Sequence, residues 1–285
     1  MTKAPALFTR RIIDFFLFTS VFIALCAVCM AYQTYYLFGV PVSVNYICFI
    51  FFGSLCSYNF HWYLTPAIYG GSYKTHWSIR NKKLHLFFFL VGLAGAAWFI
   101  LPMLHEWEWL LVSAFITFLY SAPKIPFPPF HHLKRIAIGK TIFLSLVWTH
   151  STVLLPLVLS GEVWKAEHVL FFVNRFFLIY AICILFDYRD RADDRKEGIK
   201  SLITLLPDRG IDILFWSSLG IFLLTSIALY AEGFAAADCI ALFIPGTLVA
   251  ALHSYSKKNP SDYLYYFVLD GLMMFSAILL FIIHF

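Results

Sequence analysis

The chain has 285 residues, of which 61% are hydrophobic and 13% charged, and its formal net charge is +5. A soluble domain carries about 25% charged residues, so this composition excludes an ordinary water-soluble globule and indicates lipid as the solvent. The basic balance does not indicate a nucleic-acid partner, because the Lys and Arg residues lie in short segments between apolar runs, as membrane topology requires.

Apolar runs recur along the whole chain, and a helix needs about 20 such residues to cross the hydrocarbon core. We predict membrane spans over residues 12–32, 41–64, 85–103, 108–120, 137–160, 168–187, 211–231, 236–253 and 263–285. The connections between them are short, so we expect a single transmembrane domain over residues 1–285. The predicted fold class is all-α, a polytopic membrane protein with about nine transmembrane helices.

The basic residues predict the orientation. With the N-terminus in the cytoplasm, 18 of the 21 Lys and Arg residues fall in cytoplasmic segments, and the outer loops hold only Lys165. This asymmetry follows the positive-inside rule, and with nine spans it places the C-terminus outside. In a bacterial host the membrane would be the inner (cytoplasmic) membrane.

Two kinds of residue inside the predicted spans have structural interpretations. The six cysteines all lie in apolar runs, so we interpret them as small packing residues, and no disulfide framework is indicated. Arg175 lies 12 residues before Asp187, about 18 Å away along a helix. We interpret it as a structural residue, with Glu162 and Glu167 as candidate ion-pair partners.

The richest polar segment follows the sixth predicted span. Asp187, Asp190 and Asp194 are spaced i, i+3, i+7, which places all three on one face of a helix. Stacked carboxylates repel one another unless a cation lies among them, and hard oxygen ligands suit Mg²⁺ with a substrate diphosphate. Gly198 is expected to end this helix in the left-handed conformation. The alternative is a solvated loop in which these carboxylates pair with neighbouring arginines such as Arg191.

This segment resembles the second aspartate motif of the UbiA superfamily of intramembrane prenyltransferases, approximately D-x-x-D-x-x-x-D-x-x-x-G-[IV]-K-[ST]. Seven positions match: Asp187, Asp190, Asp194, Gly198, Ile199, Lys200 and Ser201. The stretch from Tyr120 to Pro126, with Leu133-Lys134 and the segment 146–156, is similar to the loop after the fourth helix and to the fifth helix of that family. The resemblance implies a UbiA-like helix bundle around a central cavity.

The resemblance also implies roles for individual residues. Asp190 and Asp194 would be catalytic by binding Mg²⁺, with Asp187 as a third carboxylate of the metal site. The substrate diphosphate would be positioned by basic and polar residues, namely Asn59, His61, Lys124, Lys134 and Arg191. Positive charges in these loops are also what the positive-inside rule alone would produce.

One expected motif is missing. Family members carry a first aspartate motif, roughly N-D-x-x-D-x-x-x-D, at the cytoplasmic end of the second helix. Here Asn59 stands for the leading asparagine, but Phe60, Tyr63 and Ala67 occupy the carboxylate positions, and no Asp or Glu occurs between Asp14 and Glu106. Three explanations compete. Asn59, His61 and the basic residues of the 74–83 loop could bind the diphosphate directly, the protein could catalyse slowly or on another substrate, or it could have lost catalysis.

The resemblance therefore predicts a prenyltransferase with Mg²⁺ as cofactor. It would move a polyprenyl group from a polyprenyl diphosphate to a lipophilic acceptor within the membrane lipid, for which an aromatic ring of quinone type is the expectation. The alternative function is a catalytically impaired member that binds an isoprenoid lipid without turnover, and the missing first motif is its main support.

Overall fold

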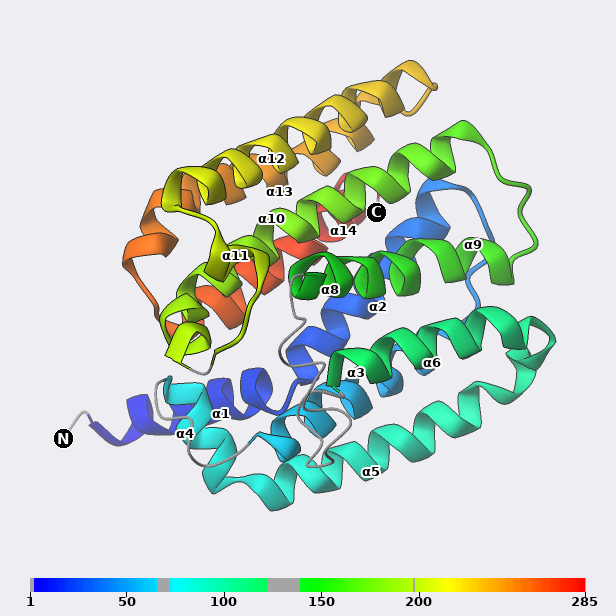
Figure 1. Ribbon diagram of the computed structural model, residues 1–285. Helices are drawn as coiled ribbons and strands as arrows, with labels where there is room; N and C mark the ends of the chain where they lie inside the picture. The colour runs from blue at the N-terminus through cyan, green and yellow to red at the C-terminus, as the bar shows by residue number, and fades with distance from the viewer. Residues whose placement is uncertain (1–2, 66–71, 122–138, 197, 285) are drawn as a thin grey trace.

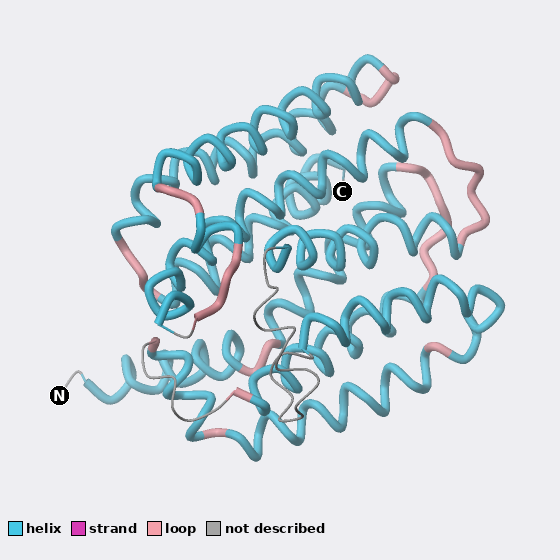
Figure 2. Tube along the Cα trace, in the orientation of Figure 1, coloured by secondary structure: helices cyan, strands magenta, loops and turns pink. Residues whose placement is uncertain are grey.

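The computed structural model describes residues 3–65, 72–121, 139–196 and 198–284, and these residues form helices and no strand (Figure 1, Figure 2). The elements in chain order are α1 (Lys3–Phe18), α2 (Val21–Leu37), α3 (Val44–Leu64), α4 (Tyr73–Arg80), α5 (Lys82–Phe99), η1 (Leu101–Glu106), α6 (Trp107–Ser121), α8 (Lys140–Thr149), η4 (His150–Leu154), α9 (Leu155–Leu159), α10 (Ala166–Lys196), α11 (Leu202–Leu205), α12 (Asp208–Ala231), α13 (Ala236–Lys258), η5 (Leu264–Leu269) and α14 (Asp270–His284). The all-α prediction is confirmed.

Helices occupy all nine of the predicted ranges, but they do not all qualify as spans. Among the described residues, six helical segments are long and apolar enough to cross a membrane: 82–99, 140–159, 166–196, 208–231, 236–258 and 264–284. The α1–α2 pair supplies a seventh if it is counted as one bent span. Helices α3 and α6 fill the two remaining positions. The chain is thus a polytopic membrane protein, and the count of nine stays a prediction.

The first predicted span, 12–32, is wrong in one respect, because it is not a single helix. The chain breaks between α1 and α2, and the two helices meet at 56°. Ser20 lies at the break with a φ of 65°, the only positive φ outside glycine among the described residues. Asn59 of α3 stabilises the break, since its side-chain amide donates to the carbonyl oxygen of Thr19 at 2.9 Å.

Helix α10 is the centre of the bundle. Its residues from Leu178 to Leu185 are all buried, which means that the helix is enclosed on every side rather than facing lipid along one stripe. It packs against α8, α12 and α13, and Figure 1 shows it running through the middle of the molecule. The helix extends past the predicted span to Lys196, and Gly198 follows with a φ of 70°. The predicted left-handed termination is confirmed.

Helices α3 and α5 approach each other unusually closely. A Cβ atom added at Gly92 of α5 would lie 2.5 Å from the backbone nitrogen of Cys56 in α3. The rings of Phe52 and Phe99 stack beside this contact, with centroids 5.8 Å apart. Small residues allow this approach, which is the usual way that helices associate in lipid.

Candidate functional site at the end of α10

The aspartate motif lies on the last turns of α10, as its spacing predicts. Charged side chains can form a helix here because the segment has left the apolar run and its residues form local pairs, such as Lys196 with Asp193 at 2.8 Å. The helix closes on Gly198, and the Ile199 amide then donates to the Asp194 carbonyl at 2.9 Å. The motif is therefore held on a rigid element.

Two of the three carboxylates converge on one cation. The Nζ atom of Lys140, in the first turn of α8, lies 3.4 Å from Asp187 Oδ1 and 3.6 Å from Asp194 Oδ2. Both aspartates are buried, at 7% and 9% exposed, and the Thr141 hydroxyl donates to the other oxygen of Asp187. The seven-residue spacing thus places two carboxylates around a single positive charge, between α8 and α10.

Asp190 has a different environment. Its side chain is 45% exposed, and Arg189 Nε donates to its Oδ1 at 2.8 Å. Within the described part of the chain, no group of three or more His, Cys, Asp or Glu side chains is arranged to hold a metal ion. The structure brings together Asp187 and Asp194, and a three-carboxylate Mg²⁺ site stays a prediction.

A second polar cluster lies beside the first and was not predicted. Lys74, in the first turn of α4, is 4% exposed, and its backbone N–H donates to Asp262 Oδ2 at 2.6 Å. Its Nζ lies 3.6 Å from the ring centroid of Tyr266 and 4.6 Å from that of Trp62. Burial lowers the pKa of Lys74 to about 7.

Arg189 joins this cluster to the aspartate motif. Its Nη2 donates to the Tyr266 hydroxyl at 3.0 Å, and its Nη1 lies 3.5 Å from Asp262 Oδ1. Because Arg189 also binds Asp190, a continuous set of charges runs from α10 to the segment before η5 and on to α4. The only available sequence signal was Lys74 itself, a basic residue in a stretch that has no acidic residue.

Asn59 and His61 have contacts within the protein. Asn59 is fully buried, and besides Thr19 its amide donates to the Leu55 carbonyl at 2.8 Å, while its Oδ1 is 2.8 Å from His85 Nδ1. His61 is half-buried and packs edge-on against Trp62, with ring centroids 6.1 Å apart. Asn59 therefore connects α3 to α5 and to the α1–α2 break.

The remaining predicted substrate-binding residues divide into one that is described and two that are not. Arg191 forms an ion pair with Asp208 and donates to the carbonyl oxygen of Leu206, so it connects α10 to the start of α12 and the residues just before it. Lys124 and Lys134 lie outside the described residues. The diphosphate-binding roles of these three residues stay predictions.

These features define a helical membrane protein with a carboxylate-rich site where its central helix leaves the apolar part of the bundle. The family model of the UbiA prenyltransferase family matches residues 78–279, which include α10 and its aspartate motif. The chain belongs to the UbiA prenyltransferase family. No curated protein and no solved structure matches the chain.

Proposed function

We propose that the protein transfers a polyprenyl group from a polyprenyl diphosphate to a lipophilic acceptor, an aromatic ring of quinone type. Family membership supports prenyl transfer in general. The observation that carries the proposal is the convergence of the buried Asp187 and Asp194 on one cation position at the end of α10.

The donor set fits Mg²⁺. Carboxylate oxygens are the ligands that this ion prefers, and two buried carboxylates already share one positive charge in this place. In the proposal Asp187, which Thr141 orients, holds the ion together with Asp190 and Asp194. Bound Mg²⁺ would neutralise the charge that develops on the departing diphosphate.

The chain's own cations would assist the reaction. The diphosphate leaves with the electron pair of the allylic C–O bond, the acceptor carbon attacks the resulting cation, and the ring then loses a proton. Arg189 is held next to the motif by Tyr266 and Asp190, and in the proposal its positive charge assists the departure of the diphosphate. Asn59, His61, Arg191, Lys124 and Lys134 are the further proposed contacts of the diphosphate.

The second candidate function is binding of an isoprenoid lipid without turnover. The observation that favours it is the aromatic and apolar character of the first-motif positions, where Phe60 and Tyr63 replace carboxylates. A single metal-binding half would hold the diphosphate but stabilise its departure less.

The test measures the thermal stability of the full chain in detergent with geranylgeranyl diphosphate, with and without Mg²⁺. A ligand at 100 times its Kd adds about 2.7 kcal/mol to stability. We expect a Mg²⁺-dependent rise in Tm that the Asp190→Asn/Asp194→Asn variant loses. Asp193→Asn is the matched control, because that carboxylate is 59% exposed and pairs only locally with Lys196.

Turnover separates the two candidate functions. Diphosphate release is measured with a panel of phenolic and naphtholic acceptors, in which a transferase releases diphosphate only when acceptor is present. Binding without release under every condition would select the isoprenoid-binding function. If the wild type shows no Mg²⁺-dependent stabilisation at any ligand concentration, both candidate functions fail.

A further inference from the structure

A buried cation lies in the half of the bundle that is remote from the aspartate motif. Arg175 of α10 is 2% exposed, and 12 residues, or about 18 Å of helix, separate it from Asp187. The candidate partners that the sequence offered are wrong. Glu167 pairs with Lys165 at 3.7 Å, and none of the carboxylates that the structure describes forms an ion pair with Arg175.

The partner of Arg175 is a neutral amide. Its Nη2 donates to Gln33 Oε1 of α2 at 2.6 Å, and the Ser276 hydroxyl of α14 donates to the same oxygen at 3.0 Å. These two donors fix the orientation of the amide, with its oxygen toward Arg175 and its nitrogen turned away. The guanidinium also lies 5.0 Å from the ring centroid of Phe171, so an aromatic face covers it.

Two donors in this group have no acceptor. Arg175 Nη1 and Gln33 Nε2 are buried and make no hydrogen bond within the described structure. A buried donor without an acceptor costs about 1–3 kcal/mol, and an uncompensated charge in lipid costs more. A negatively charged acceptor beside Gln33 Nε2 would satisfy that donor and balance the charge of Arg175.

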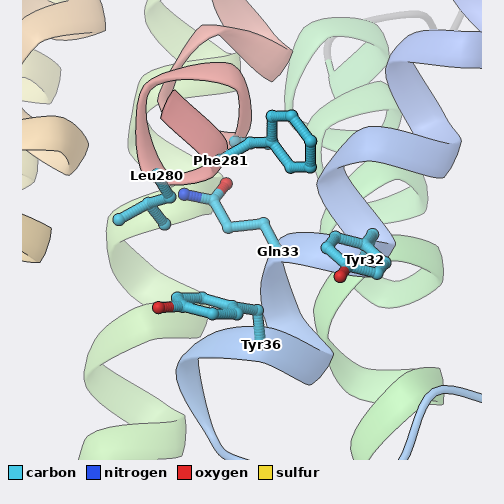
Figure 3. A pocket seen from close by; sticks show the side chains of 6 residues that line it. Tyr32, Gln33, Tyr36, Leu280 and Phe281 are labelled. Atoms are coloured by element: carbon cyan, nitrogen blue, oxygen red, sulfur yellow. The ribbon is translucent and has the colours of Figure 1, made fainter. Parts of the chain in front are cut away.

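A pocket opens at this amide. It lies between α2 and α14 and is lined by Gln33 together with Tyr32, Tyr36, Ala277, Leu280 and Phe281. Figure 3 shows the Gln33 amide between α2 and α14, with Leu280 and Phe281 on one side and Tyr36 on the other. The enclosed space is about the size of one water molecule, so it admits a single ligand atom such as an oxygen, and the rest of a ligand would lie in the open part of the pocket.

The residues that line the pocket indicate what kind of molecule could bind at the Gln33 amide. Phe281 is 59% exposed and Tyr32 is 38% exposed, so the opening is apolar and faces the lipid side of the bundle. A ligand that enters here needs a chain that is soluble in lipid and one oxygen acceptor at its end. The positive charge of Arg175 polarises the Gln33 amide through their hydrogen bond, so the site favours an acceptor that carries a negative charge.

We propose that the pocket between α2 and α14 binds the carboxylate of a single-chain lipophile such as a fatty acid. The carboxylate accepts from Gln33 Nε2, and Arg175 supplies the balancing charge. This site is separate from the aspartate motif, and the proposal does not rest on prenyl transfer.

The test uses radiolabelled hexadecanoate and the full chain in lipid nanodiscs. We expect saturable binding to the wild type that hexadecanol does not displace at equal concentration. The Gln33→Leu/Arg175→Met variant should bind at least tenfold more weakly. It removes the charge and its amide partner together and takes an acceptor only from the Ser276 hydroxyl. Replacing such a buried pair by apolar residues is often neutral for stability.

A second variant tests the charge logic directly. Gln33→Glu places a carboxylate of the chain next to Arg175, so we expect a higher Tm without ligand and loss of hexadecanoate binding. The Asp190→Asn/Asp194→Asn variant should bind hexadecanoate like the wild type, which separates this site from the proposed active site. Equal binding by the wild type and by Gln33→Leu/Arg175→Met, or displacement by hexadecanol as effective as by unlabelled hexadecanoate, would overturn the proposal.

Discussion

Lys140 is the residue whose removal tests the aspartate site most directly. Its ammonium lies 3.4 Å and 3.6 Å from two buried carboxylates, and at an effective dielectric constant of about 20 each contact contributes about 5 kcal/mol of gross Coulomb energy. Desolvation offsets much of this, and solvent reaches the lysine side chain, which is 33% exposed. We expect Lys140→Met to lower the free energy of unfolding by about 2–3 kcal/mol, because Asp187 and Asp194 then repel each other at close range.

The assay is thermal or chemical unfolding in detergent, with and without Mg²⁺. In Lys140→Met the two carboxylates lack their shared ammonium, so added Mg²⁺ should restore stability and should stabilise this variant more than the wild type. Lys257→Met is the control, because Asp212 is 39% exposed and keeps His253 at 3.1 Å after the lysine is removed. We expect a loss below about 1 kcal/mol there and no response to Mg²⁺. Equal Mg²⁺ responses in wild type and Lys140→Met would refute the idea that the carboxylates form one cation site.

Two further predictions concern residues that the site and the bundle depend on. Burial lowers the pKa of Lys74 to about 7, so between about pH 7 and 10 the unfolded chain binds more protons than the folded one. The free energy of unfolding should therefore rise with pH across this window. In a series of unfolding curves at different pH, Lys74→Met should flatten that rise. Gly92→Ala should lower the free energy of unfolding by about 1–3 kcal/mol, because its Cβ would lie 2.5 Å from a backbone atom of α3 that cannot move aside. Gly53→Ala is the control: an added Cβ there has no atom within 4 Å, so Tm should stay unchanged or rise. Equal effects of the two substitutions would contradict the close approach of α3 and α5.

The local features of this protein were open to prediction from its sequence. Apolar runs give the helix positions because lipid requires every backbone group to be bonded within its own segment. The spacing of Asp187 and Asp194 predicts a shared helix face, and a glycine after a charged helix end predicts the left-handed residue at Gly198. Each inference needed only a few neighbouring residues.

Features that depend on distant contacts were not predictable in this way. The break at Ser20 has no glycine or proline to announce it, and it depends on an amide from Asn59, 40 residues from the carbonyl of Thr19 that it binds. Lys74 meets Asp262 across 188 residues of chain. A basic residue in a loop carries the same sequence signal whether it faces solvent or is buried against Tyr266, so only the packing of α4 against η5 distinguishes the two.

Buried charges in the two halves of α10 have opposite kinds of partner. At one end the carboxylates of Asp187 and Asp194 receive a counter-charge from Lys140, and Thr141 satisfies a further oxygen. In the other half of the helix Arg175 meets the neutral Gln33 amide and the ring of Phe171, and Arg175 and Gln33 each retain a buried donor without an acceptor in the described structure. Because both environments lie on one rigid helix, the contrast cannot come from local flexibility. In our proposal a negatively charged ligand in the neighbouring pocket balances the charge of Arg175. A cation that binds between Asp187 and Asp194 must instead displace Lys140.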